Sequence, residues 1–495
     1  MSNTVKNFIT LMLTACLTIA AAPAANAGEA KAPAPAYFDL PVVIKTIKVG
    51  LRSGGSSVYE ARLLNSVGSG YLFGYFDYAR QFHELGKTEV TALSMRGDSG
   101  FTLPDGMVVG PWHMVLNKKF NDFASAKKYA DTLWGGFPGY INGEYKVLVG
   151  AYADETKTMS AIKSRSMDAR PFTGSGYSVL AAETDTSELQ FLMDVGEGTN
   201  LAIRPVSKSE KAETWFDGNA YHGDFQYTRS GGGLTVINFV DLEDYVMGVL
   251  PYEMHGDWPQ EALKAQGACA RTYAMNNINA YIDRGFDVRN DTYSQVYRGV
   301  TGTVESTNKA ATETSGEYVR YRGSVCKVYY MSSDGGATDS SANVFSQKRA
   351  YLSGVKDDNE KDIEYYNKSW KTELYDANVV YRLAMSDYEL ADIADIKVTK
   401  SDMGNVIKLV FSDSKGNTVT LYGEDCFRVT GFNSLRYDVS SYENEQKERI
   451  WVFKGSGWGH NCGMSQWGAI GYARNGWNYQ QILTHYFTGT TITTY

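Results

Sequence analysis

The chain has 495 residues, of which 43% are hydrophobic and 21% are charged, with a formal net charge of -8. This length exceeds what one hydrophobic core usually supports, so it predicts about two to four globular domains. The negative charge argues against a nucleic-acid or polybasic membrane-binding role, because both need a positive surface. It leaves a neutral polymer such as a glycan open.

The N-terminus carries the pattern of an export signal. An apolar run follows Lys6 and ends at Ala27 after small residues, which predicts a signal peptide over residues 1–27. Two alternatives stay open: LTAC at residues 13–16 resembles a lipobox that would lipidate Cys16, or the run is an uncleaved anchor. Each places the protein outside the cytoplasm, secreted, in the cell wall or on the outer face of the cytoplasmic membrane.

The four later cysteines show no paired spacing of the kind found in disulfide scaffolds or zinc sites. We expect all four to be buried structural thiols. They are Cys269, Cys326, Cys426 and Cys462.

A short Ala/Pro/Lys-rich lead (residues 28–37) precedes a region with β-strand patterning (residues 38–106). Strand and helix patterns then alternate twice between residues 107 and 170, with Asp122 and Asp154 in equivalent places 32 residues apart. This duplication, with "YKVLVGAYAD", resembles the SPOR domain, a module that binds peptidoglycan glycans. A generic α+β insert is the alternative.

The remaining region, residues 175–495, begins with more strand patterns and continues as mixed helices and strands. Its core is predicted at residues 234–490. The fold class is therefore α+β and multidomain, with a β-rich N-terminal region, a small βαβ-repeat domain and a mixed C-terminal domain.

The segment "DLEDYVMGVLPYEM" places an acidic residue among apolar neighbours. Asp241 is predicted to cap a helix that Pro251 ends, which puts Glu253 in a turn. A carboxyl group in such surroundings tends to have a raised pKa, as a general acid needs. A solvated turn glutamate is the alternative.

The helix that follows carries two cations. Lys264 and Arg271 are seven residues apart, hence on one face and roughly 10 Å apart along the axis. They could hold sugar substituents, orient Glu253, or be surface charges.

The block "GSGWGHNCGMSQWGA" at residues 455–469 combines flexible glycines with indole, imidazole and amide side chains. Such a turn would suit the wall of a sugar-binding cleft, with tryptophan stacking on a pyranose ring. His460 is either structural or a hydrogen-bond partner of Glu253 or of substrate. The candidate contacts here are Trp458, His460, Ser465 and Gln466.

These segments, with "WPQEALKAQGACARTYA" and "YYMSSDGGAT", together resemble the SpoIID/LytB family (stage II sporulation protein D). The resemblance implies a lytic transglycosylase that cleaves MurNAc–GlcNAc bonds of peptide-stripped glycan strands. Its catalytic glutamate corresponds to Glu253, and its lysine and arginine correspond to Lys264 and Arg271. One carboxylate would then suffice, because the sugar's own 6-hydroxyl attacks and leaves a 1,6-anhydro end.

Two departures from the family pattern affect the expected site. Where some members carry a zinc site at a Thr-His-Cys stretch, this chain has TYS at residues 292–294, so we expect no metal and no cofactor. The usual His-Ser-Ser-Ser-Gly-Gly reads "MSSDGG" here. Ser332 and Ser333 remain candidate substrate contacts, whereas Met331 and Asp334 put binding or turnover in doubt.

Three hypotheses follow. The first is an exported lytic transglycosylase acting on glycan strands, in sporulation or other wall turnover. The second is a non-catalytic glycan-binding protein or amidase enhancer, with a wall amidase as partner. The third is a structural wall protein.

Overall fold

The computed structural model describes residues 45–102, 108–208, 211–230, 232–360, 363–365 and 368–494. The predicted signal peptide, the lipobox cysteine Cys16 and the lead at 28–37 lie outside these residues. Two compact units form: an N-terminal unit of Ile44–Tyr252 with Asn277–Thr303, and a C-terminal unit that contains Glu253–Asn276 and Val304–Tyr495. The fold is α+β, as predicted. No helix in the described ranges is both long and apolar enough to cross a membrane.

Two sheets make up most of the N-terminal unit. The first has the spatial order β19 (Val288–Arg289), β1 (Thr46–Arg52), β18 (Gly233–Asp241), β17 (Asp224–Ser230), β14 (Ala202–Pro205), β3 (Tyr71–Phe76) and β4 (Phe82–Thr88). The second has the order β11 (Ala169–Thr173), β8 (Trp112–Leu116), β10 (Glu144–Tyr152), β9 (Gly136–Ile141), β13 (Leu189–Asp194), β12 (Val179–Glu183), β5 (Ala92–Gly97), β2 (Glu60–Asn65), β15 (Thr214–Phe216) and β16 (Asn219–Tyr221).

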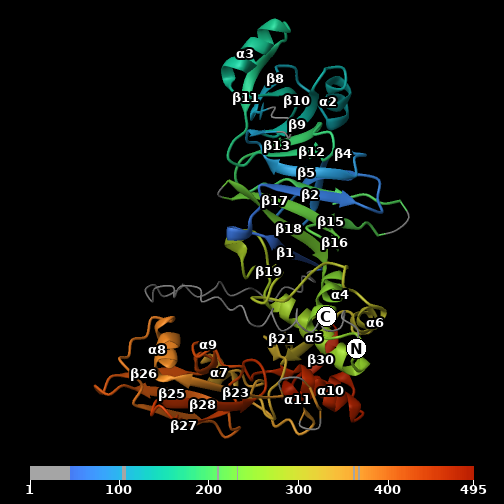
Figure 1. The fold of residues 1–495 in the computed structure, drawn as a ribbon. Coiled ribbons are helices and arrows are strands. Elements are labelled where there is room, and N and C mark those ends of the chain that lie inside the picture. The colour runs from blue at the N-terminus through green and yellow to red at the C-terminus, as the bar shows by residue number, and fades with distance from the viewer. Residues whose placement is uncertain are drawn as a thin grey trace. The chain divides into compact units, whose positions relative to one another are not determined.

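The repeated strand–helix pattern forms one end of the second sheet. Strands β8 to β11 enclose helices α2 (Phe123–Ala130) and α3 (Glu155–Ser164), which lie beside them in Figure 1. Asp122 caps α2 by accepting from the Ser125 N–H at 2.7 Å, and Asp154 caps α3 by accepting from the Lys157 N–H at 2.7 Å. The 32-residue duplication thus marks equivalent helix starts.

The sheet face opposite α2 and α3 is also buried. Alternate strand residues point to opposite faces, so Met114 packs with the helices while its neighbour Val115 packs with Leu180 and Leu192 of β12 and β13. Strands of the N-terminal β-rich region also pair with later ones, β5 with β12 and β2 with β15. The predicted boundaries at 38–106, 107–170 and 175 onward therefore run through shared sheets.

Helix α4 (Leu242–Glu253) begins where the sequence predicts, since Asp241 Oδ1 accepts from the Glu243 N–H at 2.8 Å. Its predicted end was wrong. The helix continues through Pro251 to Glu253, because a proline in the last turn removes only one N–H and leaves the preceding turns intact.

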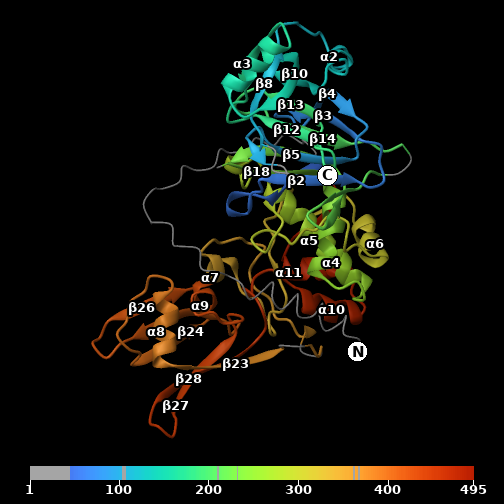
Figure 2. The same cartoon turned by 45° about the horizontal axis from the view of Figure 1, so that its top comes forward.

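The C-terminal unit is built around α5 (Gln260–Asn276). Helices α6 (Glu305–Glu313), α10 (Gln466–Arg474) and α11 (Tyr479–Tyr486) pack against it, as Figure 2 shows. The four described cysteines are free and buried, as predicted.

Short sheets and helices complete this unit. The sheets are β21 (Ser324–Val325), β20 (Glu317–Tyr321) and β30 (Thr491–Thr494); β22 (Tyr330–Met331) and β29 (Met464–Ser465); β23 (Ser369–Tyr375), β28 (Arg449–Ser456) and β27 (Tyr437–Glu443); and β24 (Asp395–Lys400), β25 (Val406–Ser412) and β26 (Thr418–Tyr422). The further helices are α7 (Ser341–Phe345), α8 (Asp376–Ala384) and α9 (Asp425–Arg428).

Candidate functional site

Glu253 is the partly exposed last residue of α4. Gln466, the first residue of α10, donates through Nε2 to Glu253 Oε2 at 3.4 Å and to Gln266 Oε1 at 3.5 Å. Both glutamines are buried. Residues more than 200 positions apart in the chain thus meet at one carboxylate, and Gln466 holds one of its two oxygens.

Three partly exposed aromatic rings are linked to this point. The Trp258 and Trp467 rings are 4.9 Å apart, and Tyr365 stacks on Trp467 at 4.6 Å with an interplanar angle of 11°. Trp467 follows Gln466 directly, and the backbone N–H of Trp467 donates to the Ser332 carbonyl at 3.0 Å. Flat rings with polar edges suit the apolar face and hydroxyl rim of a sugar. The sequence did not single out Tyr365.

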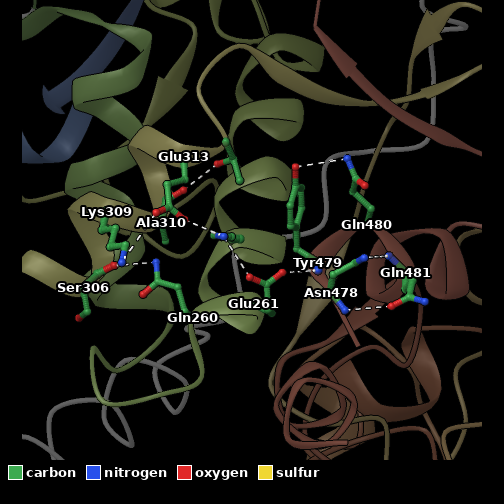
Figure 3. Close-up of polar contacts among 12 residues, drawn as sticks. Gln260, Glu261, Ser306, Lys309, Ala310, Glu313, Asn478, Tyr479, Gln480 and Gln481 are labelled. Carbon is green, nitrogen blue, oxygen red and sulfur yellow. Dashed lines mark hydrogen bonds and ion pairs between the residues drawn. The ribbon is translucent and has the colours of Figure 1, made fainter. Parts of the chain in front are cut away.

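Lys264 lies in an ion-pair network between helices. Its Nζ is 3.0 Å from Glu261 Oε1 and 2.6 Å from Glu313 Oε2, and Figure 3 shows these two glutamates. Glu261 also accepts from the Tyr479 N–H of α11 at 2.8 Å. Burial alone would lower the pKa of Lys264, but the hydrogen bonds that its ammonium group donates to Glu313 and Glu261 outweigh burial and raise the pKa. The ammonium group is thus engaged within the protein.

Arg271 is fully buried, with no exposed surface. Its guanidinium donates to the carbonyls of Ala311 at 3.2 Å and Glu317 at 3.3 Å, and to Thr314 Oγ1 at 3.5 Å. These contacts tie α5 to the end of α6 and the start of β20. In this structure Arg271 is buried, and its contacts hold these elements together.

Ser333 and Ser465 converge on a residue that the sequence did not identify, Glu360. The Ser333 hydroxyl donates to Glu360 Oε1, and the Ser465 hydroxyl donates to Oε2 at 2.6 Å. Both serines are fully buried, and Ser465 also caps α10. The only sequence signal for Glu360 was its place in the acidic run "KDDNE".

Trp458 and His460 lie in the segment between β28 and β29. The backbone of Trp458 pairs with that of Ser333. The His460 ring packs edge-on against Tyr329 and Phe345, and its Nδ1 accepts from the Cys462 N–H at 3.2 Å. Burial lowers the pKa of His460 to about 4. The imidazole is therefore neutral near pH 7.

One group of described residues has the ligand types and spacing to hold a metal ion. It comprises Asp334, Asp357 and Glu360, all buried. The expected absence of a metal rested on residues 292–294 and did not concern this group.

Comparison with known proteins identifies a family. A family model described as SpoIID, stage II sporulation protein, matches residues 230–321, which include α4, α5 and α6. A Brachyspira hyodysenteriae protein of uncharacterised function is 34% identical over 290 residues, covering 56% of this chain and 74% of that protein.

Two Bacillus subtilis proteins are also similar. The amidase enhancer is 27% identical over 440 residues, which is 74% of this chain and 60% of that protein. Stage II sporulation protein D is 26% identical over 276 residues, or 51% of this chain and 74% of that protein.

Fold and site together define an α+β protein with a partly exposed glutamate at a helix end, held by a glutamine from a distant motif. The chain belongs to the SpoIID family.

Proposed function

We propose that this protein is an exported peptidoglycan lytic transglycosylase that cleaves MurNAc–GlcNAc bonds of peptide-stripped glycan strands. The observation that carries the proposal is the contact of Glu253 with Gln466, which joins two of the motifs that resemble the family. Membership of the SpoIID family and the names of the relatives support action at the cell wall.

In the proposed reaction Glu253 first protonates the glycosidic oxygen as the bond to C1 breaks. It then accepts the proton of the sugar's 6-hydroxyl, whose oxygen attacks C1 and closes the 1,6-anhydro ring. The carboxyl group returns to its starting state, so no water is consumed and no second carboxylate is needed. Gln466 fixes the orientation of one carboxylate oxygen, which is the geometric requirement for general acid–base catalysis.

The other candidate residues take two kinds of role. Ser332 and Trp458 remain proposed substrate contacts near the aromatic rings. The helices and loops that carry Glu253 and Gln466 are held by Lys264, Arg271, Ser333 and Ser465. His460 supports the segment between β28 and β29 in which it lies.

The test compares wild type, Glu253→Gln and the surface control Glu445→Gln on purified, peptide-stripped glycan strands, with mass spectrometry of the chain ends. Glu445 is exposed in the turn between β27 and β28, so its variant reproduces the charge change away from the site. We expect 1,6-anhydro ends from wild type and the control, and none from Glu253→Gln. Anhydro ends at an equal rate from all three would refute the role of Glu253.

A non-catalytic role, as a glycan-binding protein or amidase enhancer, is the second candidate. The buried Asp334 within "MSSDGG" favours it, as does the similarity to a protein named amidase enhancer. In that case no protein variant makes anhydro ends, and wild type and Glu253→Gln stimulate a wall amidase equally. The amidase would then be the protein partner.

We further propose that the βαβ-repeat segment binds glycan, in the manner of the SPOR domain it resembles. The sheet face opposite its helices is buried, so the contact would use the outer surface, where Trp134 is 87% exposed beside Arg165. Trp134→Ala should lower retention on insoluble glycan while leaving cleavage of short soluble strands unchanged. Unchanged retention would count against this segment.

A further inference from the structure

Three carboxylates meet beneath the candidate site, within the C-terminal unit. Asp334 follows β22, and Asp357 and Glu360 precede β23. Each offers an oxygen that lies within 4.8 Å of the others, and none is more than 1% exposed. The three come from two loops that the sequence separates by more than 20 residues.

Among the described residues, which leave out residues 361 and 362 directly after Glu360, no lysine, arginine or histidine forms an ion pair with any of the three carboxylates. Burying several carboxylates without a counter-charge is costly, and proteins compensate with a bound metal or a proton.

One oxygen in the cluster lacks a donor. Asp334 Oδ1 accepts from the Gly336 N–H at 2.7 Å, but no described N–H or O–H group donates to Asp334 Oδ2. The other two carboxylates are well supplied: Glu360 accepts from backbone N–H groups and hydroxyls on both oxygens, and Asp357 from the N–H groups of Asn359 and Glu360. A buried acceptor without a donor calls for a specific occupant.

We propose that Asp334, Asp357 and Glu360 bind one divalent cation of the oxygen-preferring class, Ca²⁺. Ca²⁺ takes about six to eight oxygen ligands in a flexible geometry, carboxylates among them, whereas Mg²⁺ demands near-ideal octahedral geometry and usually keeps several waters. The three carboxylates each bring an oxygen within 4.8 Å of the others in a buried setting, and so supply ligands of this type. The hydroxyl groups of Ser465 and Tyr486, which contact the carboxylates, are neutral oxygens that could serve as further ligands.

The competing occupant is a proton. Asp334 lies close enough to Glu360 to share one, and Glu360 is already an acceptor for several donors. The two occupants differ in one respect that can be measured: an asparagine at position 334 imitates the protonated acid in shape and donates a hydrogen bond, but it cannot supply an anionic ligand.

Occupancy would also reach the candidate site. Ser465 contacts Glu360 and is followed by Gln466, which contacts Glu253. A cation would thus brace the start of α10. This consequence rests on the proposed function, whereas cation binding itself does not.

The experiment uses the full chain after chelation and exchange into metal-free buffer. Ca²⁺ is added, and bound metal is measured by calorimetry and elemental analysis, with thermal unfolding as the second readout. The variants are Asp334→Asn, Asp334→Ser, which restores the usual family residue, and the control Asp438→Asn, whose side chain is 85% exposed.

We expect wild type and the control to bind one Ca²⁺ per chain and to show a Tm that rises with Ca²⁺ concentration. Both position-334 variants should lose the binding and the rise. No Ca²⁺ binding by wild type, or equal binding by Asp334→Asn, overturns the proposal; an Asp334→Asn variant as stable as wild type, with no Ca²⁺ response in either, identifies the proton. Because no glycan is present, failure here is separate from failure of the transglycosylase proposal.

Discussion

Arg271 provides a direct test of whether a predicted substrate contact is instead part of the core. Replacing it with methionine keeps an unbranched side chain of similar reach but removes every donor. The hydrogen bonds from its guanidinium to the carbonyls of Ala311 and Glu317 would be lost. The bond to Ala311 is buried and the bond to Glu317 is partly buried, and Arg271 itself has no exposed surface.

The magnitude follows from these two bonds. A hydrogen bond from a charged donor contributes about 1.5–3 kcal/mol, so Arg271→Met should lower the free energy of unfolding by about 3–6 kcal/mol. Losses of this size arise only when buried networks or cores are broken. The matched control is Lys309→Met on α6, whose side chain is 61% exposed; it should change stability by less than about 0.5 kcal/mol.

Urea unfolding followed by tryptophan fluorescence measures both variants, and glycan binding is measured under conditions where each remains folded. Folded Arg271→Met should retain glycan binding. The reasoning is refuted if this variant loses less than about 1 kcal/mol of stability and yet loses glycan binding, because Arg271 would then contact the ligand.

Three further predictions concern pH, charge and packing. The pKa of His460 is about 4 in the folded state and about 6.5 in the unfolded chain. Between these pH values the unfolded state therefore binds more protons than the folded state. The contribution of His460 to the free energy of unfolding is full above pH 6.5, and about 3 kcal/mol is lost as the pH falls toward 4. His460→Gln should flatten that part of the unfolding profile, and an unchanged slope would contradict the assignment. The hydrogen bond from Lys264 is the main cause of the lowered pKa of Glu313, so in Lys264→Met an NMR titration should show that pKa returning toward its ordinary value, whereas no movement would mean that the pair does not persist in solution. Gly468→Ala in α10 would place a methyl group 1.9 Å from Asp357 Oδ2 and 2.0 Å from the Tyr486 hydroxyl; although alanine favours helices by about 1 kcal/mol, overpacking should lower stability by about 1–3 kcal/mol in urea unfolding, and a gain would show that the site has room.

Features that depend on a few neighbouring residues were predictable from the sequence. Asp241 caps a helix as predicted, and the duplicated positions Asp122 and Asp154 both prove to be caps, because a cap bonds to an N–H group two or three residues away. The α+β class and the buried thiols follow from equally local patterns. The local pattern was wrong about the end of α4, because Pro251 lies in the last turn and the preceding turns do not depend on an N–H group at that position.

Only the tertiary structure decided what the functional candidates contact. Helical spacing puts Lys264 and Arg271 on α5, but their partners, Glu313 and the carbonyls of Ala311 and Glu317, come from segments 40 or more residues away. Glu253 meets Gln466 across 213 residues. Such pairings depend on how helices and loops pack around a shared core, where burial and unsatisfied hydrogen-bonding groups select partners, and residue type and spacing along the chain do not contain that information.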